Sequence, residues 1–328
     1  MNSVHRPLVI AHRGASGYLP EHTLEAYTLA VRQGADFIEP DLVMTRDGVL
    51  VARHENEIGS TTDVAKRFPG RRTTRLVDGV EVDGWFVEDF SLEELRSVRA
   101  RERLPFRDHA HDGRMAVPTW DEILALRARL TLETGRPIGV YPETKHPTYF
   151  RSIGLPLEEP LLEALTAHGL EGFDAPVFIQ SFETGNLQWL RQRTGIRLVQ
   201  LLESTGGPWD WTAKGMPGSY ADLTTPAGLQ RVAGYADAIG PHKRLVIPEA
   251  PDGSLVAATT LVADAHAAGL LVHPWTFRSD PQFLHDAYAG IPARELRQFA
   301  ALAVDGVFAD FPDVAAAAFR HHGDADPG

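Results

Sequence analysis

Pairs of residues that could do chemistry recur in this sequence at a spacing of two positions. The pairs that follow or interrupt apolar runs are Glu39 with Asp41, Glu143 with Lys145, Gln180 with Phe182, and His273 with Trp275. Side chains two positions apart on a β-strand point to the same face. We therefore expect the members of each pair to point together into one cavity, at the ends of the strands that carry them.

The carboxylates among these pairs are candidate metal ligands. Glu39, Asp41 and Glu143 would repel one another in a small space, and their pKa values would rise, unless a cation held them. Ligation by oxygen alone selects a hard ion such as Ca²⁺ or Mg²⁺. Two alternatives remain, namely a zinc ion held by histidines, or simple ion pairs with surface arginines. Carboxylates that end an apolar strand are costly without a partner, which favours the metal.

The balance of charge indicates what such a site would bind. Three carboxylates and one divalent ion leave one negative charge, and Arg13 and Lys145 add two positive charges. The remaining positive charge matches a phosphodiester monoanion, which an arginine can grip through two oxygens. His12 and His54 each end an apolar run, and with a pKa of about 6.5 they could act as base and acid on opposite sides of phosphorus. The alternative for each is a core histidine that is hydrogen-bonded to the backbone.

The first of these histidines belongs to a predicted unit of strand, loop and helix. Residues 8–11 are all apolar, as in a strand that is covered on both faces of a parallel sheet. His12, Arg13 and Gly14 follow, and Thr23 is placed to cap a helix that begins at Leu24. Open α/β sheets and βα barrels carry their sites at the carboxyl ends of strands. A surface loop that merely contains histidine and arginine is the alternative.

The rest of the chain alternates between predicted strands and helices. We count about nine strand candidates, and since eight would close a barrel, one is short or pairs outside it. Only an Asp47–Gly48 turn separates the strands at 37–43 and 49–55, which is too short for a crossover helix. The first strand is not followed by a Gly-x-Gly-x-x-Gly motif, which disfavours a doubly wound dinucleotide-binding sheet. We predict a (β/α)8 TIM barrel.

We predict a single catalytic domain over residues 1–328, with a small inserted subdomain at about 56–117, after the third strand. That stretch has few long apolar runs, but it holds Trp85, Phe86 and Phe90, which argues against a linker. Trp209 and Trp211 lie in a predicted loop at 206–218, where packing of the loop is a simpler explanation than a binding role. Residues 321–328 are expected to form a disordered tail.

Composition excludes several classes of function. The 328 residues carry a net charge of −12, which argues against binding to nucleic acid or anionic lipid. Cysteine is absent, so disulfides, thiolate zinc sites and a cysteine nucleophile are excluded. No apolar run approaches the roughly 20 residues of a membrane helix. No signal peptide is recognisable, so we expect a cytoplasmic protein as the sequence stands, or a periplasmic or secreted one if an export signal was removed. The expected partner is a small-molecule substrate, and the oligomeric state is open.

Short motifs follow one another along the chain in a characteristic order. They are His12-Arg13-Gly14, Pro20-Glu21-His22-Thr23, Glu39-x-Asp41, the Asp47-Gly48 turn before His54, Glu143-Thr144-Lys145, Gln180-Ser181-Phe182, Trp275-Thr276 and Asp310-Phe311-Pro312. From about residue 8 to residue 316, this set resembles the glycerophosphodiester phosphodiesterase family. The stretches 63–69 and 273–280 are similar to the calcium-dependent, periplasmic type, which has a long insertion.

The resemblance implies a (β/α)8 barrel that hydrolyses glycerophosphodiesters to sn-glycerol 3-phosphate and an alcohol. By motif position it makes His12 and His54 the acid/base pair. It makes Glu39, Asp41 and Glu143 the ligands of one divalent cation, with Ca²⁺ preferred and Mg²⁺ as the alternative. The implied substrate-binding residues are Arg13, Lys145, Gln180, Phe182 and Trp275.

In the mechanism we favour, the free glycerol hydroxyl attacks phosphorus while one histidine takes its proton and the other protonates the departing alcohol. Water then opens the cyclic phosphate. Two departures from the family pattern stand out, since Glu55 follows His54 where the family usually has Asp, and exported relatives carry a signal peptide. Alternatives are the same chemistry on polymeric glycerophosphate or a lysophospholipid, and a non-catalytic phosphodiester-binding protein, although no expected histidine or carboxylate is missing.

Overall fold

Strands and helices alternate along the chain in the computed structural model, which describes residues 6–320. The strands are β1 (Leu8–His12), β2 (Phe37–Glu39), β3 (Asp41–Met44), β4 (Leu50–Ala52), β5 (Thr73–Val77), β6 (Val80–Gly84), β7 (Gly139–Val140), β8 (Glu143–Thr144), β9 (Phe178–Ser181), β10 (Arg197–Leu202), β11 (Ala238–Pro241), β12 (Leu271–Val272) and β13 (Gly306–Ala309). The predicted tail at 321–328 lies outside the described residues.

The α-helices are α1 (Leu24–Arg32), α2 (Val64–Arg67), α3 (Leu92–Leu95), α4 (Trp120–Thr134), α5 (Pro147–Ser152), α6 (Glu158–Ala167), α7 (Thr184–Arg191), α8 (Trp209–Ala213), α9 (Tyr220–Thr224), α10 (Pro226–Ala233), α11 (Lys243–Val246), α12 (Leu261–Ala267), α13 (Pro292–Ala301) and α14 (Pro312–Arg320). Single 3-10 turns form η1 (Pro69–Arg71), η2 (Val87–Asp89) and η3 (Asp286–Tyr288). Thr23 caps α1 as predicted, since its side chain accepts a hydrogen bond from the backbone N–H of Ala26.

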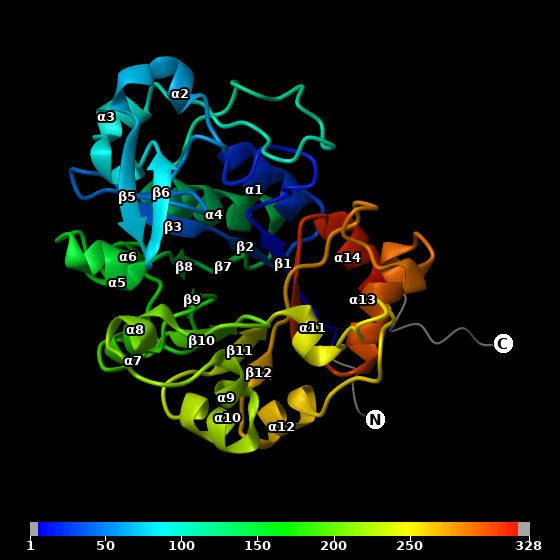
Figure 1. Cartoon of the computed structure of the whole chain (residues 1–328). Helices are drawn as coiled ribbons and strands as arrows, with labels where there is room; N and C mark the ends of the chain where they lie inside the picture. The colour runs from blue at the N-terminus through cyan, green and yellow to red at the C-terminus, as the bar shows by residue number, and fades with distance from the viewer. Residues whose placement is uncertain (1–5, 321–328) are drawn as a thin grey trace.

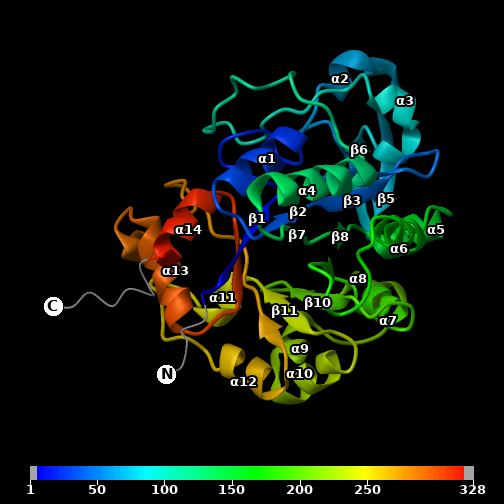
Figure 2. The same cartoon turned by 180° about the vertical axis from the view of Figure 1, so that it is seen from behind.

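The parallel strands close into a barrel. One sheet has the order β13-β1-β2-β7 and the other has the order β12-β11-β10-β9-β8-β3-β4. β2 and β3 form one strand interrupted at Pro40, and β7 and β8 form one strand interrupted at residues 141–142. Parallel bridges from Val140 to Val177 and from Phe277 to Ala309 join the two sheets. The ring therefore has eight strands with helices around it, which is a (β/α)8 barrel (Figure 1; Figure 2).

β4 is the extra strand of the sequence-based count, and it pairs outside the ring. It runs antiparallel to β3, with Leu42 opposite Ala52. Because β4 reverses the direction of β3, the chain returns to the point where β3 began. There the backbone N–H of Arg53 donates to the carbonyl of Asp41, at 3.0 Å. The hairpin of β3 and β4 thus brings His54 back beside the carboxyl end of β2.

Below the carboxyl ends of the strands, side chains fill the interior of the barrel. A cluster of buried side chains occupies it: Ile10, Phe37, Tyr141, Phe178, Val199, Ala238 and Phe308. His273 lies among them, fully buried, with its Nδ1 2.7 Å from the Tyr141 hydroxyl. The prediction that His273 joins Trp275 in the cavity is therefore wrong, because His273 sits one layer lower in the barrel core.

Residues 56–117 form a hairpin of β5 and β6, the short helices α2 and α3, and extended loops. They lie above the barrel in the view of Figure 1, where they are coloured light blue to green. Phe86 and Phe90 of this segment belong to the same continuous core as the layer between the barrel strands and helices. Within residues 6–320, none of the helices has the length and apolar character needed to span a bilayer.

Candidate active site

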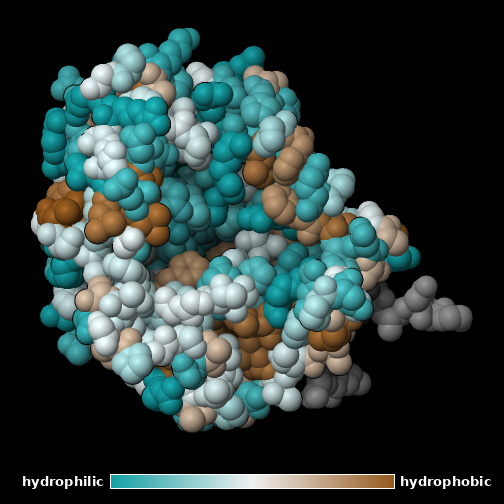
Figure 3. All heavy atoms as spheres, in the orientation of Figure 1, coloured by the Kyte–Doolittle hydropathy of each residue, from teal (hydrophilic) through white to brown (hydrophobic). Residues whose placement is uncertain are grey.

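One cavity at the carboxyl ends of the barrel strands gathers nearly all the side chains that the sequence singled out. It has a volume of about 420 Å³ and is lined by His12, Arg13, Glu39, Asp41, His54, Glu143, Gln180, Leu201, Phe182, Trp275, Thr276, Arg278 and Phe308. Of the predicted site residues, Lys145 lines a neighbouring cavity instead and pairs with Glu143. Figure 3 shows a hollow on this face, between the upper part of the molecule and the lower half of the barrel.

The three predicted metal ligands converge in this cavity. Glu39, Asp41 and Glu143 are buried, and each offers an oxygen within 4.8 Å of the others. Burial and the negative charges of Asp41 and Glu143 raise the pKa of Glu39 well above its ordinary value. Burial also raises the pKa of Glu143 to about 8, although Lys145 opposes this shift. A divalent cation relieves such crowding of like charges, and the all-oxygen donor set suits a hard ion. The residues present therefore fit a Ca²⁺ or Mg²⁺ ion.

Hydrogen bonds orient these carboxylates from behind. Glu39 accepts from the backbone N–H of Arg13 at 2.8 Å and from the side-chain amide of Gln180 at 3.0 Å. Asp41 Oδ2 lies 2.9 Å from Nε2 of His22, a buried residue in a left-handed conformation with a φ of 57°. Burial acts to raise the pKa of Asp41, but the hydrogen bond from His22 and nearby positive charges hold that pKa well below its ordinary value. Glu39 and Asp41 are thus fixed in direction before any ligand arrives.

Two buried cations border the carboxylates. The guanidinium of Arg13 lies 3.1 Å from Glu21 and 3.4 Å from Asp41, and Lys145 Nζ lies 2.9 Å from Glu143. Burial opposes their charged forms, but the surrounding carboxylates hold the pKa of Arg13 and that of Lys145 above their ordinary values. Fixed positive charges therefore stand beside the position where an anionic group would meet the metal.

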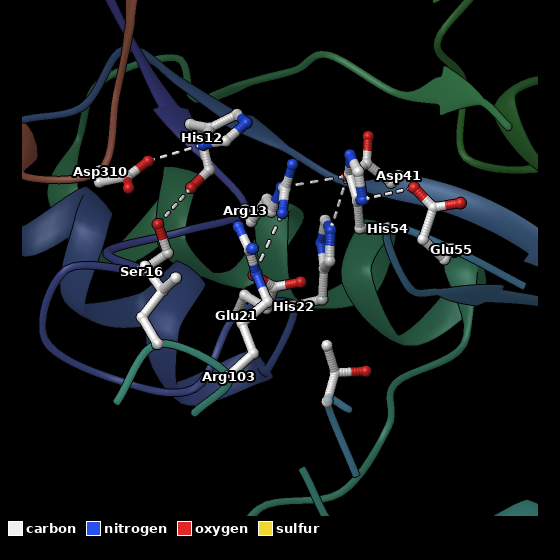
Figure 4. Close-up of polar contacts among 12 residues, drawn as sticks. His12, Arg13, Ser16, Glu21, His22, Asp41, His54, Glu55, Arg103 and Asp310 are labelled. Atoms are coloured by element: carbon white, nitrogen blue, oxygen red, sulfur yellow. Dashed lines mark hydrogen bonds and ion pairs between the residues drawn. The ribbon is translucent and has the colours of Figure 1, made fainter. Parts of the chain in front are cut away.

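His12 is anchored by the barrel itself (Figure 4). Its Nδ1 lies 2.6 Å from Asp310, which directly follows β13, the strand paired with β1. The other oxygen of Asp310 accepts from Arg107 at 2.6 Å and from Arg278 at 3.1 Å. Burial and the charge of Arg13 lower the pKa of His12 to about 4, although Asp310 opposes the shift. The imidazole is neutral at neutral pH, and because Nδ1–H is given to Asp310, Nε2 is left to accept a proton.

His54 is anchored by side chains from three loops. Its Nδ1 lies 2.9 Å from Glu55 Oε1, and Glu55 Oε2 lies 2.9 Å from Nε2 of His146. Nδ1 of His146 lies 2.6 Å from Asp78, at the tip of the β5–β6 hairpin. Burial acts to lower the pKa of His146, but its hydrogen bonds to Asp78 and Glu55 raise that pKa to about 9. A charged imidazolium thus links the carboxylate behind His54 to the segment 56–117.

The two histidines differ in exposure but not in charge state. The side chain of His54 is 31% exposed and that of His12 is 11% exposed. Burial and the positive charges of Arg13 and Lys145 hold the pKa of His54 below its ordinary value. In Figure 4 the guanidinium of Arg13 lies between the two imidazoles. An anion bound at Arg13 would therefore have one imidazole on either side.

Several supporting residues were not predicted from the sequence. Asp310 follows the apolar run 307–309, and this position at a strand end is the signal that could have identified it, as it identified Glu39 and Glu143. Arg107 carries no local signal, because its partners Asp280 and Asp310 lie far along the chain. The rings of Phe182 and Trp275 both line the cavity, and their centroids are 5.8 Å apart.

Comparisons with curated proteins identify the family. Residues 12–314 match the model of the Glycerophosphoryl diester phosphodiesterase family. The glycerophosphodiester phosphodiesterase GDPD6 of Arabidopsis thaliana is 36% identical over 321 residues, covering 93% of this chain and 84% of the relative. A glycerophosphodiester phosphodiesterase of Haemophilus influenzae is 33% identical, covering 93% of this chain and 88% of the relative.

Solved structures of other proteins share this fold. An Oleispira antarctica phosphodiesterase, in complex with the product sn-glycerol-3-phosphate, has a TM-score of 0.62 at 21% identity, and the match covers 96% of this chain and 97% of that one. A glycerophosphodiester phosphodiesterase from Agrobacterium tumefaciens has a TM-score of 0.61 at 21% identity, covering 95% of this chain and 99% of that one. The chain belongs to the glycerophosphoryl diester phosphodiesterase family.

Proposed function

We propose that this protein hydrolyses glycerophosphodiesters to sn-glycerol 3-phosphate and an alcohol. The observation that carries the proposal is one cavity in which buried carboxylates, a buried arginine and two histidines meet. The family and the names of its relatives support the same reaction. A phosphodiester monoanion matches the positive charge that remains once a divalent cation has joined the carboxylates.

We assign Ca²⁺ to Glu39, Asp41 and Glu143. The similarity of residues 63–69 and 273–280 to the calcium-dependent subgroup supports Ca²⁺ over Mg²⁺. The same similarity supports assigning residues 56–117 as the insertion of that subgroup, within a single catalytic domain. When bound, the ion would supply positive charge to the phosphoryl oxygens, an effect of several kcal/mol on the barrier in comparable sites.

The side chains of this cavity, together with Lys145 beside Glu143, divide the remaining work. Arg13 and Lys145 hold the non-bridging phosphoryl oxygens, and Phe182 and Trp275 face the glycerol carbons. One neutral imidazole takes the proton of the glycerol hydroxyl next to the ester as that oxygen attacks phosphorus. The other imidazole, protonated beside the bound anion, gives its proton to the departing alcohol. Water then opens the cyclic phosphate with the two proton transfers reversed, which yields sn-glycerol 3-phosphate.

Release of sn-glycerol 3-phosphate from glycerophosphocholine, glycerophosphoethanolamine, glycerophosphoglycerol and a polymeric glycerophosphate tests the function. We expect release from at least the small diesters, loss of that release in EDTA, and best recovery with added Ca²⁺. Full activity in chelator would remove the metal from the mechanism, and no release from any of these compounds would overturn the function itself.

A further inference from the structure

A second cavity of about 510 Å³ adjoins the first. Glu143 and Phe182 line both cavities, so the second one opens directly beside the proposed metal position. Its remaining lining is contributed by Asp78, Thr144, Lys145, His146, Pro147, Glu183, Gly207, Trp209 and Tyr220. A substrate whose phosphate lies at Glu143 and Lys145 could therefore extend a substituent into each cavity.

Three aromatic rings, those of Phe182, Trp209 and Tyr220, form part of the wall of this second cavity. The ring centroids of Phe182 and Tyr220 are 6.1 Å apart. Trp209 lies on α8, within the stretch predicted to be a loop, and its ring packs on Gly79 at the tip of the β5–β6 hairpin. In Figure 1 that tip points down toward α8, so the hairpin and the barrel loops meet across the cavity. Trp211 packs elsewhere, since its indole N–H donates to Thr184 at 2.7 Å.

The charges along this wall leave one carboxylate without a cation. Lys145 is paired with Glu143, and His146 is held between Asp78 and Glu55. Glu183 is only 4% exposed and accepts hydrogen bonds from the hydroxyl and the backbone N–H of Thr148. Among residues 6–320 it forms no ion pair. The ionised form of a buried carboxylate without a cationic partner is stabilised when a cation enters the cavity beside it.

The local field is negative around this carboxylate. Burial raises the pKa of Glu183 to about 7, and the charges of Asp78 and Asp210 add to that shift. Burial likewise raises the pKa of Tyr220, and the charges that reinforce it come from carboxylates, with Glu183 foremost. A positive charge in the cavity would lower the cost of ionising Glu183, whereas a neutral group would leave that cost in place.

We propose that the second cavity receives the alcohol part of the substrate and selects an alcohol that carries a quaternary ammonium group. The inference rests on the proposed function, because it takes the phosphate to lie at the metal position. Aromatic faces and a buried carboxylate attract such cations together, and the rings exclude the water that would otherwise screen the charge. A neutral alcohol of the same shape gains the packing but not the attraction.

The same placement distinguishes the two histidines. His146 and Asp78 line the second cavity, and they are joined to His54 through Glu55. His12 is anchored instead at Asp310, on the other side of Arg13 (Figure 4). His12 and His54 both line the first cavity, but only His54 is linked to residues of the second. We therefore take His54 as the group that protonates the departing alcohol and His12 as the group that takes the proton of the glycerol hydroxyl.

The test compares glycerophosphocholine with the diester of its neutral isostere, 3,3-dimethylbutanol, through the ratio of their kcat/KM values. We expect the wild-type protein to favour the choline ester by about tenfold or more. Glu183→Gln and Trp209→Leu should each reduce this ratio by about tenfold. Glu163→Gln, which removes the same charge from an exposed position on α6, should leave the ratio unchanged.

Two outcomes separate the inference from the function on which it rests. Hydrolysis of both esters by the wild-type protein at similar kcat/KM, or a ratio that neither variant moves, would overturn the selectivity while leaving the function intact. Hydrolysis of neither ester would overturn the function. Thermal unfolding of the variants identifies any loss that comes from misfolding, and Trp209→Leu provides a second route if Glu183→Gln does not fold.

Discussion

The two ends of the active site hold their histidines in different ways. His12 ends a barrel strand, and its partner Asp310 ends the neighbouring strand and is locked by Arg107 and Arg278. His54 follows β4, outside the ring, and its partner Glu55 has a side chain that is 48% exposed. The barrel therefore fixes one proton-transfer group, whereas loops and the segment 56–117 place the other.

The largest effect is expected from removing either imidazole. His12→Ala and His54→Ala should each lower kcat on glycerophosphocholine by about 10³-fold or more, because each removes a proton transfer. An ester of p-nitrophenol needs no acid for its departure, so it should restore turnover to His54→Ala but not to His12→Ala. Release of p-nitrophenol measures this, and equal rescue of both variants would contradict the assignment of acid and base.

Asp310→Asn should lower kcat by about 10²-fold. Asparagine keeps the shape of Asp310 but removes its negative charge. That charge stabilises protonated His12 and balances Arg107 and Arg278. Because residue 310 is only 2% exposed, water cannot replace the lost charge. Thermal unfolding should show a lower Tm as well, because buried cations lose their partner. A variant with normal kcat and normal Tm would show that this carboxylate does not support His12.

Glu55→Gln should have a smaller effect, about tenfold on kcat, because water can replace a half-exposed partner of His54. Glu55→Asp restores the residue usual in the family but shortens the side chain, so the contact with His146 should be lost while that with His54 is kept. We therefore expect Glu55→Asp to retain more activity than Glu55→Gln in the same assay. A loss in Glu55→Gln as large as that of Asp310→Asn would erase the contrast between the two ends.

The smallest effect is expected at Asp78, which contacts His54 only indirectly, through His146 and Glu55. Burial acts to lower the pKa of His146, but contacts with carboxylates raise it to about 9 in the folded protein. These contacts therefore stabilise the fold fully below about pH 6.5, the ordinary pKa of histidine, and the stabilisation is lost as the pH rises through about 9. Asp78→Asn should cost about 1 kcal/mol of unfolding free energy at pH 6 and almost nothing at pH 10.

Denaturant titrations at the two pH values measure that difference. Asp83→Asn on the same hairpin is the matched control, since its ion pair with Arg72 is exposed and involves no histidine. A cost for Asp78→Asn that is the same at both pH values would show that His146 does not stay charged between its carboxylates.

The sequence was informative where one strand carries its own chemistry. The spacing of two predicted that Glu39 and Asp41 point the same way, and the short Asp47–Gly48 turn predicted the break that β4 makes in the barrel pattern. The same rule failed for His273. Side chains two positions apart both point into the barrel, but they lie in successive layers of it, and His273 lies in the layer below the cavity. Only the upper one, Trp275, reaches the cavity.

Contacts between distant segments could not be predicted in this way. His12 and Asp310 are 298 positions apart, and Asp78 and His146 are 68 positions apart. Neither pair follows from a local period, because each depends on how the ring closes or how the hairpin folds back over it. The place of Trp209 in a cavity wall could not be predicted either, because it depends on the tip of the β5–β6 hairpin packing against α8.

The contact between Gly79 and Trp209 has a consequence for how this protein could diversify. A side chain at position 79 would begin 2.6 Å from the indole ring, so even alanine must push the tryptophan aside. Mutations at this turn change the wall of the second cavity, so they offer a route by which the range of accepted alcohols could widen or narrow without a change in His12 or His54.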